Sequence, residues 1–284
     1  MTPPAGVRIV EVGPRDGLQY ESRTVPTDAK VAFIDALSAT GLREIEVTAF
    51  VSPKWIPKLA DADDVARGIR RAEGVAYSAL VPNERGLERA MAAGVDRGAV
   101  FTAATDGFTR NNINCTVAES FERFRPVFRA AAVPVRAYVS TAFWCPFEGR
   151  TDPARTAEVA RRLADLGAYE VSIGDTTGKA DGDAVRALLD FLLPFPVPVA
   201  LHFHDTYGKA LANALVARRE YGIAAFDGSA GGLGGCPYAP GAAGNVATEA
   251  LVRALEGEGA ATGVDADAVA AAARLLAPHI GRSP

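Results

Sequence analysis

The chain has 284 residues, of which 49% are hydrophobic and 23% charged, proportions typical of a globular protein and not of a disordered or fibrous one. Its 34 acidic and 30 basic residues give a net charge of −4, which argues against a nucleic-acid-binding protein, because such a protein would carry a basic stripe. Three widely spaced cysteines do not suit a secreted disulfide framework, and no apolar run is long enough to span a membrane. We therefore expect a cytoplasmic protein that binds neither nucleic acid nor a membrane.

Short apolar, β-branched runs alternate along the chain with helical patterns. The runs predict eight strands, over residues 8–12, 44–48, 76–81, 97–102, 135–141, 168–173, 197–203 and 225–229. A helix is predicted after each strand, over residues 27–40, 62–71, 83–93, 117–132, 153–166, 183–193, 209–221 and 245–257. One more alanine-rich helix is predicted over residues 265–279.

Eight such units in a chain of this length predict an α/β protein with a closed (β/α)8 TIM barrel, a parallel sheet with helices outside. The alternative is an open, doubly wound sheet, which more often has a glycine-rich phosphate loop after its first strand. Here that turn reads GPRDG over residues 13–17, which is not GxGxxG. We expect one domain over residues 1–284, with the additional C-terminal helix packed across the barrel.

The pair His202-x-His204 stands at the end of the seventh predicted strand. Strand residues two apart point to the same face, so both imidazoles are expected to aim at one spot in the barrel mouth, where TIM barrels place their chemistry. Asp16 and Asn245 follow the first and eighth strands, which lie next to the seventh in a closed barrel. Imidazole nitrogens with carboxylate or amide oxygens suit a divalent metal, so we predict a metal site here. Two buried, hydrogen-bonded histidines are the alternative.

Cys236 lies in a glycine-rich segment after the eighth strand, residues 231–241. A loop of this composition can bend over a site at the barrel mouth, and a cysteine delivered there can act as an acid or a base. An inert thiol in a turn is the alternative interpretation. No second cysteine stands at the C-x-x-C spacing of a structural zinc site, so such a site is not predicted.

Charged residues follow other predicted strands as well. Arg15, next to Asp16, places a fixed cation where an enolate or carboxylate can form, and an ion pair of Arg15 with Glu46 or Glu249 is a compatible alternative. Glu46 is a candidate for orienting the groups that contact the metal. Asp175 can do the same, or it can cap the helix that follows it.

Three basic residues, Lys54, Arg110 and Lys179, lie in predicted loops at the same mouth. They can meet the phosphates of a large substrate or cofactor. The alternative is that each is a solvated surface charge, which is the commoner situation for such residues.

A divalent metal, a fixed arginine and a thiol suit a reaction that forms an enolate: a hydroxyl proton is removed, a C–C bond breaks and an acid protonates the enolate. Motifs in several parts of the chain then carry a family resemblance. They are GPRDGLQ at 13–19, FVSPKW at 50–55, NINC at 112–115 after Arg110, HFHDTYG at 202–208, and GLGGCP at 232–237 running on to Asn245. On these motifs the chain resembles the 3-hydroxy-3-methylglutaryl-CoA lyases, which belong to the metal-dependent TIM-barrel lyases and synthases.

The resemblance implies cleavage of 3-hydroxy-3-methylglutaryl-CoA to acetoacetate and acetyl-CoA with Mg²⁺ or Mn²⁺, as in leucine degradation and ketone-body formation. It also implies an acyl-CoA substrate and a homodimer. The implied metal ligands are Asp16, His202, His204 and Asn245. The implied catalytic residues are Cys236, which protonates the enolate, Arg15, which stabilises it, and His202, which transfers a proton. The implied acidic residues around the site are Glu46, Asp175 and Glu249.

The chain departs from the family pattern at Ala49, where a serine is common, at Trp144, where a small residue is usual, and at 179–181, where Thr-Pro is usual. A tryptophan at the mouth can narrow the acyl pocket, so a related 3-hydroxy-acyl-CoA is an alternative substrate. A second alternative is a synthase of the same barrel family that condenses acetyl-CoA with a 2-oxo acid. A third is a non-catalytic barrel that binds metal or acyl-CoA.

Overall fold

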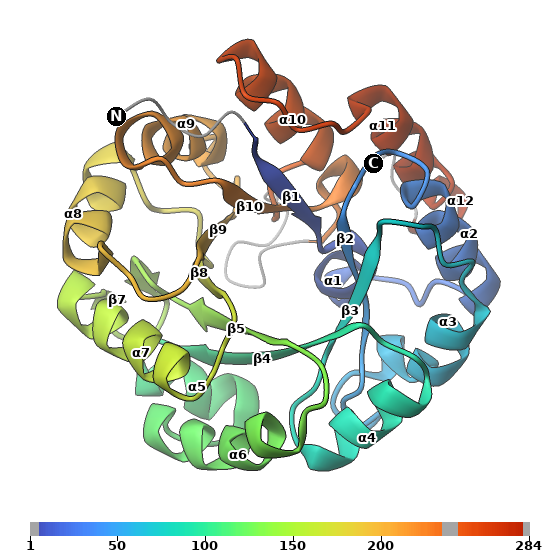
Figure 1. Cartoon of the computed structure of the whole chain (residues 1–284), viewed down its shortest axis with the longest axis horizontal. Coiled ribbons are helices and arrows are strands. Elements are labelled where there is room, and N and C mark those ends of the chain that lie inside the picture. Colours follow the sequence, from blue (N-terminus) through green and yellow to red (C-terminus); the bar gives the residue numbers. More distant parts are fainter. Residues whose placement is uncertain (1–5, 235–243, 281–284) are drawn as a thin grey trace.

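The computed structural model describes residues 6–234 and 244–280. Eight parallel strands close into a barrel in the order β1-β10-β9-β8-β5-β4-β3-β2, which confirms the predicted fold (Figure 1). The strands are β1 (Arg8–Glu11), β2 (Glu44–Ala49), β3 (Ala76–Leu80), β4 (Arg97–Ala103), β5 (Val135–Ser140), β8 (Val171–Asp175), β9 (Val199–Phe203) and β10 (Ala225–Gly228).

Helices surround the barrel and bury their apolar faces against it. Those that were predicted to follow the eight strands are α2 (Thr27–Leu37), α3 (Ala62–Gly68), α4 (Glu84–Ala92), α6 (Val117–Ala130), α7 (Pro153–Asp165), α8 (Gly182–Leu192), α9 (Ala210–Tyr221) and α10 (Thr248–Gly257). Local sequence fixes several starts: Asn83 caps α4 by accepting from the Gly86 amide, and Asp152 caps α7 ahead of Pro153.

Some elements differ from the prediction. The turn after β1 is a π-helical turn, Gly13–Gly17, that runs into α1 (Leu18–Tyr20). An additional helix, α5 (Asp106–Ile113), lies between β4 and α6, and a small hairpin, β6 (Trp144–Cys145) with β7 (Gly149–Arg150), lies between β5 and α7. These short segments carry no long periodic pattern, so the sequence offered little to detect them.

The C-terminal part also needs correction. Asn245 was placed in a helix, but it lies before α10 and forms a β-bridge with His204. The last predicted helix is two helices, α11 (Ala266–Arg274) and α12 (Ala277–Ile280). They do not pack across the barrel: α11 lies between α10 and α2 in the outer layer. Among the described residues, no helix combines the length and the apolarity needed to cross a membrane.

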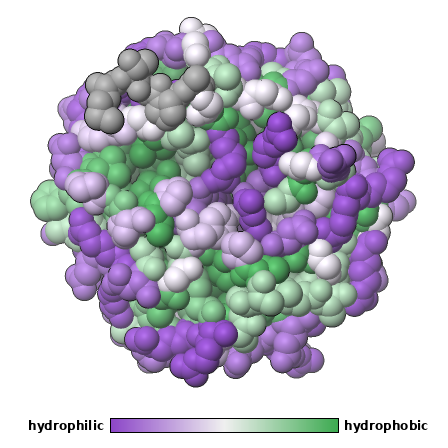
Figure 2. Space-filling view, in the orientation of Figure 1, coloured by the Kyte–Doolittle hydropathy of each residue, from purple (hydrophilic) through white to green (hydrophobic). Residues whose placement is uncertain are grey.

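The barrel interior contains charged groups in place of a purely apolar filling. Glu44, Arg136, Glu170 and Asp227 are all buried on strands or directly before them, and Arg136 forms ion pairs with Glu170 and Asp227. Arg8 joins this group by ion pairs to Glu44 and Glu170. Hydrophilic residues also gather near the middle of the face shown in Figure 2.

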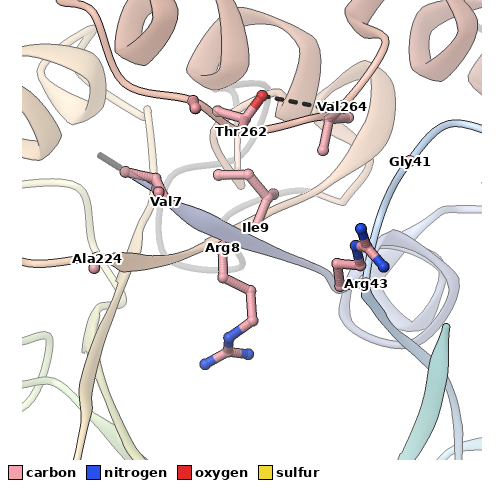
Figure 3. A pocket seen from close by; sticks show the side chains of 10 residues that line it. Val7, Arg8, Ile9, Gly41, Arg43, Ala224, Thr262 and Val264 are labelled. Atoms are coloured by element: carbon pink, nitrogen blue, oxygen red, sulfur yellow. Dashed lines mark hydrogen bonds between the residues drawn. The ribbon is translucent and has the colours of Figure 1, made fainter. Parts of the chain in front are cut away.

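A pocket of about 330 Å³ lies at the N-terminal ends of the strands. Val7, directly before β1, and Ile9 of β1 line it from one side, and Thr262 and Val264 line it from another (Figure 3). Chemistry in this type of barrel occurs at the opposite end, where the strands finish.

Candidate active site

The turn after β1 places the first two candidate residues. The carbonyl oxygen of Val12 accepts from the amides of Arg15, Asp16 and Gly17, at 3.1, 2.7 and 3.3 Å, so both side chains are held on a tight turn. A Cβ at Gly17 would stand 2.8 Å from Leu233, so glycine lets this turn approach the segment after β10.

Asp16, His202 and His204 are brought together at the C-terminal mouth of the barrel. One ligand atom from each lies within 4.8 Å of the others, and the two imidazole centroids are 5.3 Å apart. Asp16 and His204 are buried, and His202 is nearly so. The arrangement matches the expected convergence of the two histidines with the residue after the first strand.

Asn245 completes this group. Its Nδ2 donates to Asp16 Oδ2 at 3.0 Å and to the carbonyl oxygen of Leu233 at 3.2 Å. Its Oδ1 and the Nδ1 of His204 are buried, and neither has a hydrogen-bond partner among the described residues. Buried polar atoms normally have partners, so this donor set of two imidazoles, a carboxylate and an amide oxygen fits a divalent cation.

The electrostatics also suit a cation. Burial alone would raise the pKa of Asp16, but the charge of Arg15, together with the protonated forms of His202 and His204, outweighs it and lowers that pKa below the ordinary value. Burial and the charge of His202 lower the pKa of His204 to about 4. Asp16 is therefore ionised and His204 neutral near pH 7, which are the states that ligate metals.

Arg15 is clamped between two carboxylates. Its Nε donates to Glu46 Oε2 at 2.8 Å and its Nη1 donates to Asp16 Oδ1 at 2.5 Å. Tyr138 donates to the same Glu46 oxygen at 3.1 Å, and the guanidinium lies 5.3 Å from the Tyr138 ring centroid. Arg15 thus forms the expected ion pair with Glu46, whereas Glu249 accepts from the Gly231 amide.

Asp175 ends β8 beside these groups. Its Oδ2 accepts from the Ala180 amide at 2.9 Å, so the carboxylate holds the loop that follows the strand. Burial raises the pKa of Asp175 to about 6, although the backbone amides oppose this shift. Asp175 does not cap α8, because Asp181 caps it by accepting from the Ala184 amide.

The remaining site residues that the sequence predicted lie farther from the metal cluster. Lys54 is exposed in the loop after β2, and Arg110 is exposed on α5, the helix that the sequence did not reveal. The Nζ of Lys179 lies 4.5 Å from the ring centroid of Trp144 on the β6–β7 hairpin. Cys236 lies outside the described residues.

Sequence reasoning missed the groups beneath the site. Asp227 of β10 lies 3.3 Å from His202 Nδ1, and Arg136 of β5 binds Asp227. The sequence does contain a pattern that could have identified such groups. Polar residues recur two apart in the strands, as in Glu44-x-Glu46 and Arg136-x-Tyr138, and residues so spaced share one face of the sheet.

The fold and this site define a barrel with an acid–imidazole cluster at its mouth, and the comparisons with known proteins agree. A family model described as HMGL-like matches residues 6–276. The mitochondrial hydroxymethylglutaryl-CoA lyase of Rattus norvegicus is 50% identical over 99% of this chain and 88% of its own length. The chain belongs to the HMGL-like family, as its motifs indicated.

Solved structures show the same similarity. The HMG-CoA lyase of Bacillus subtilis has a TM-score of 0.96 and 47% identity, covering 99% of this chain and 96% of that one. An HMG-CoA lyase of Acinetobacter baumannii, solved with coenzyme A and 3-methylmalate, has a TM-score of 0.90 and 37% identity over 98% and 92% of the two chains.

Proposed function

We propose that this protein cleaves 3-hydroxy-3-methylglutaryl-CoA to acetyl-CoA and acetoacetate with the help of a divalent cation. The observation that carries the proposal is the cluster of Asp16, His202 and His204 at the mouth of an HMGL-like barrel. The name of the rat relative, at 50% identity over nearly the whole chain, supports the substrate.

We assign the cation, Mg²⁺ or Mn²⁺, to Asp16, His202, His204 and Asn245. Asn245 Oδ1 and His204 Nδ1, which find no hydrogen-bond partner in the part of the chain that the structure describes, support this assignment. Such a cation, when bound, polarises the oxygen atoms of the substrate that carry the developing charge. The hydrogen bond from Asn245 Nδ2 to Asp16 leaves the amide oxygen free to face the site.

The reaction takes one proton from the C3 hydroxyl group and returns one proton to C2. As the hydroxyl proton leaves, its electron pair forms the carbonyl of acetoacetate, the C2–C3 bond breaks, and the bonding pair forms the enolate of acetyl-CoA. We assign acceptance of the hydroxyl proton to His202, whose Nε2 takes that proton only while it is not bound to the cation, and we assign protonation of the enolate to Cys236. Arg15, held by Glu46, supplies a fixed positive charge for the enolate oxygen.

The positions of other residues support auxiliary roles. Glu46 orients Arg15, and Asp175 fixes the loop beside His204. We assign Lys54 and Arg110, both exposed, to the phosphates of coenzyme A. The coenzyme A bound to the Acinetobacter baumannii relative supports an acyl-CoA ligand. A homodimer, a cytoplasmic location, one domain over residues 1–284, and a place in leucine degradation and ketone-body formation stay predictions.

The experiment is a mass-spectrometric assay of the full chain with 3-hydroxy-3-methylglutaryl-CoA in Mg²⁺, in Mn²⁺ and in EDTA. We expect acetyl-CoA and acetoacetate in equal amounts with either metal and none in EDTA. Absence of cleavage by folded, metal-loaded protein would overturn the proposal.

The same preparation tests the competing functions. A panel of related 3-hydroxy-acyl-CoAs tests the alternative that Trp144 alters the acyl pocket. Release of free coenzyme A from acetyl-CoA plus a 2-oxo acid would show a synthase instead. Tight binding of acyl-CoA without turnover, under every metal, would show a binding protein.

A further inference from the structure

Arg136 lies inside the barrel beneath the candidate metal centre, with a side chain that is 1% exposed. Each of its three side-chain nitrogens donates to a different residue. Nη2 donates to Asp227 Oδ1 at 2.6 Å, Nη1 to the Tyr138 hydroxyl at 2.8 Å and Nε to Glu170 Oε1 at 2.7 Å. A planar guanidinium can make these three bonds at once, and a lysine ammonium in the same place cannot reproduce that fork.

One of these bonds leads to the metal centre. Asp227 is held through Oδ1 by Arg136 and through Oδ2 by the Ser172 hydroxyl at 2.8 Å. Its Oδ2 also lies 3.3 Å from Nδ1 of His202. The negative charge of this carboxylate favours the tautomer of a neutral imidazole that carries its proton on Nδ1, which leaves the lone pair of Nε2, 3.9 Å from Asp16 Oδ2, facing the site.

The second bond leads to the arginine on the other side of the site. Tyr138 accepts from Arg136 and donates to Glu46 Oε2 at 3.1 Å. That same oxygen accepts from Arg15 Nε at 2.8 Å. Arg136 is therefore joined to His202 through one residue and to Arg15 through two, and all these links are buried.

We propose that Arg136 is a positioning residue that orients the metal-facing imidazole of His202 and the enolate-facing guanidinium of Arg15 together. The proposal rests on the proposed function for the roles of His202 and Arg15. A merely structural arginine would neutralise the carboxylates of Asp227 and Glu170. Its loss would then change the stability of the protein without a specific effect on His202 or Arg15. The two interpretations differ in what a charge-preserving substitution does.

The test is Arg136→Lys, measured as Mn²⁺ affinity by electron paramagnetic resonance and as kcat and KM for 3-hydroxy-3-methylglutaryl-CoA. We expect Mn²⁺ affinity to fall by about 10- to 100-fold, as when other groups that orient metal ligands are removed. We also expect kcat to fall at saturating Mn²⁺, because Arg15 loses its support. Arg97→Lys is the matched control, since Arg97 binds Glu44 at the opposite end of the interior, and both values should stay within about twofold of the parent.

Two further variants test the connection to His202 and the connection to Arg15 separately, and they remain informative if Arg136→Lys does not fold. Asp227→Asn should lower Mn²⁺ affinity, whereas Tyr138→Phe should lower kcat and leave Mn²⁺ affinity unchanged. The proposal would be overturned if a folded Arg136→Lys protein kept the Mn²⁺ affinity and the kcat of the parent. It would also be overturned if both Asp227→Asn and Tyr138→Phe kept them.

A metal-free readout distinguishes failure of this proposal from failure of the proposed function. The chain has three histidines, so ¹⁵N spectra of the imidazoles are simple to assign. We expect the Nδ1-protonated tautomer at His202 in the parent and a mixture of tautomers in Arg136→Lys. An unchanged tautomer would contradict the positioning role even if the parent cleaved no substrate.

Discussion

Asn245 donates a 3.0 Å hydrogen bond to Asp16, although the two residues are 229 positions apart in the chain. The bond closes the gap between the turn after β1 and the segment after β10, and it turns the amide oxygen of Asn245 away from Asp16. One residue thus orients a carboxylate and presents an oxygen of its own, which is what a metal site with few protein ligands requires.

Substitution of Asn245 tests this double role. We expect Asn245→Ala to weaken Mn²⁺ binding by about 10- to 100-fold, since an amide oxygen and the support of Asp16 are both lost. Asn213→Ala is the matched control, because Asn213 is also a buried asparagine but donates to the Ala180 carbonyl in the loop after β8 and not to a candidate metal ligand. Mn²⁺ titration of both variants in the full chain is the measurement, and equal affinities would exclude Asn245 from the site.

The sequence predicted the convergence of Asp16, His202 and His204 because two simple rules sufficed. Strand residues two apart share a face, and neighbouring strands of a closed barrel end at the same mouth. Asn245 was chosen for its place after the eighth strand, and its nearness to Asp16 follows from that, even though it was wrongly placed in a helix.

The same two rules do not predict the buried charged residues that lie beneath the site. Arg136 and Asp227 lie within strands and Glu170 directly before one, where a barrel of this kind is usually filled by branched apolar residues. Pairing them requires the register between strands, which only tertiary structure defines. The π-helical turn after β1 was missed for a different reason: five residues are too few to show a period.

Cys236 is predicted to transfer a proton and not to bind the metal. We therefore expect Cys236→Ala to bind Mn²⁺ as the parent does and to lose about 10²- to 10⁴-fold in kcat, the range for removal of a general acid. Cys115→Ala, which alters a buried thiol on another loop, should keep near-parental turnover. Parental kcat in Cys236→Ala would remove this cysteine from the mechanism.

Trp144 is expected to limit the size of the acyl group. It lies half-buried on the β6–β7 hairpin, with Lys179 against its ring, so two loops at the mouth are joined by this contact. We expect Trp144→Gly to raise kcat/KM for the 3-ethyl homologue relative to 3-hydroxy-3-methylglutaryl-CoA by about tenfold. Phe147→Ala, an exposed change on the same hairpin, should leave the ratio unaltered. A ratio that does not move in Trp144→Gly would rule out a role in acyl selection.

Glu11 joins three segments around the site without contacting the metal cluster. Its Oε1 accepts from the amides of Gly13 and Ala230, at 2.8 and 2.9 Å, and its Oε2 accepts from the Thr248 hydroxyl at 2.7 Å. Burial raises the pKa of Glu11 from 4.5 to about 7, and these hydrogen bonds offset only part of that effect.

This raised pKa predicts a pH-dependent stability. Between pH 4.5 and about 7 the folded protein keeps a proton on Glu11 that the unfolded chain has lost, so the free energy of unfolding falls by about 1.4 kcal/mol per pH unit as the pH rises. Glu11→Gln stays neutral and can donate to Thr248, so its stability relative to the parent should be near zero at pH 4.5 and rise by roughly 3 kcal/mol by pH 7.5. Urea unfolding of both proteins in EDTA gives this difference, and a difference that is constant across the range would show that Glu11 ionises normally.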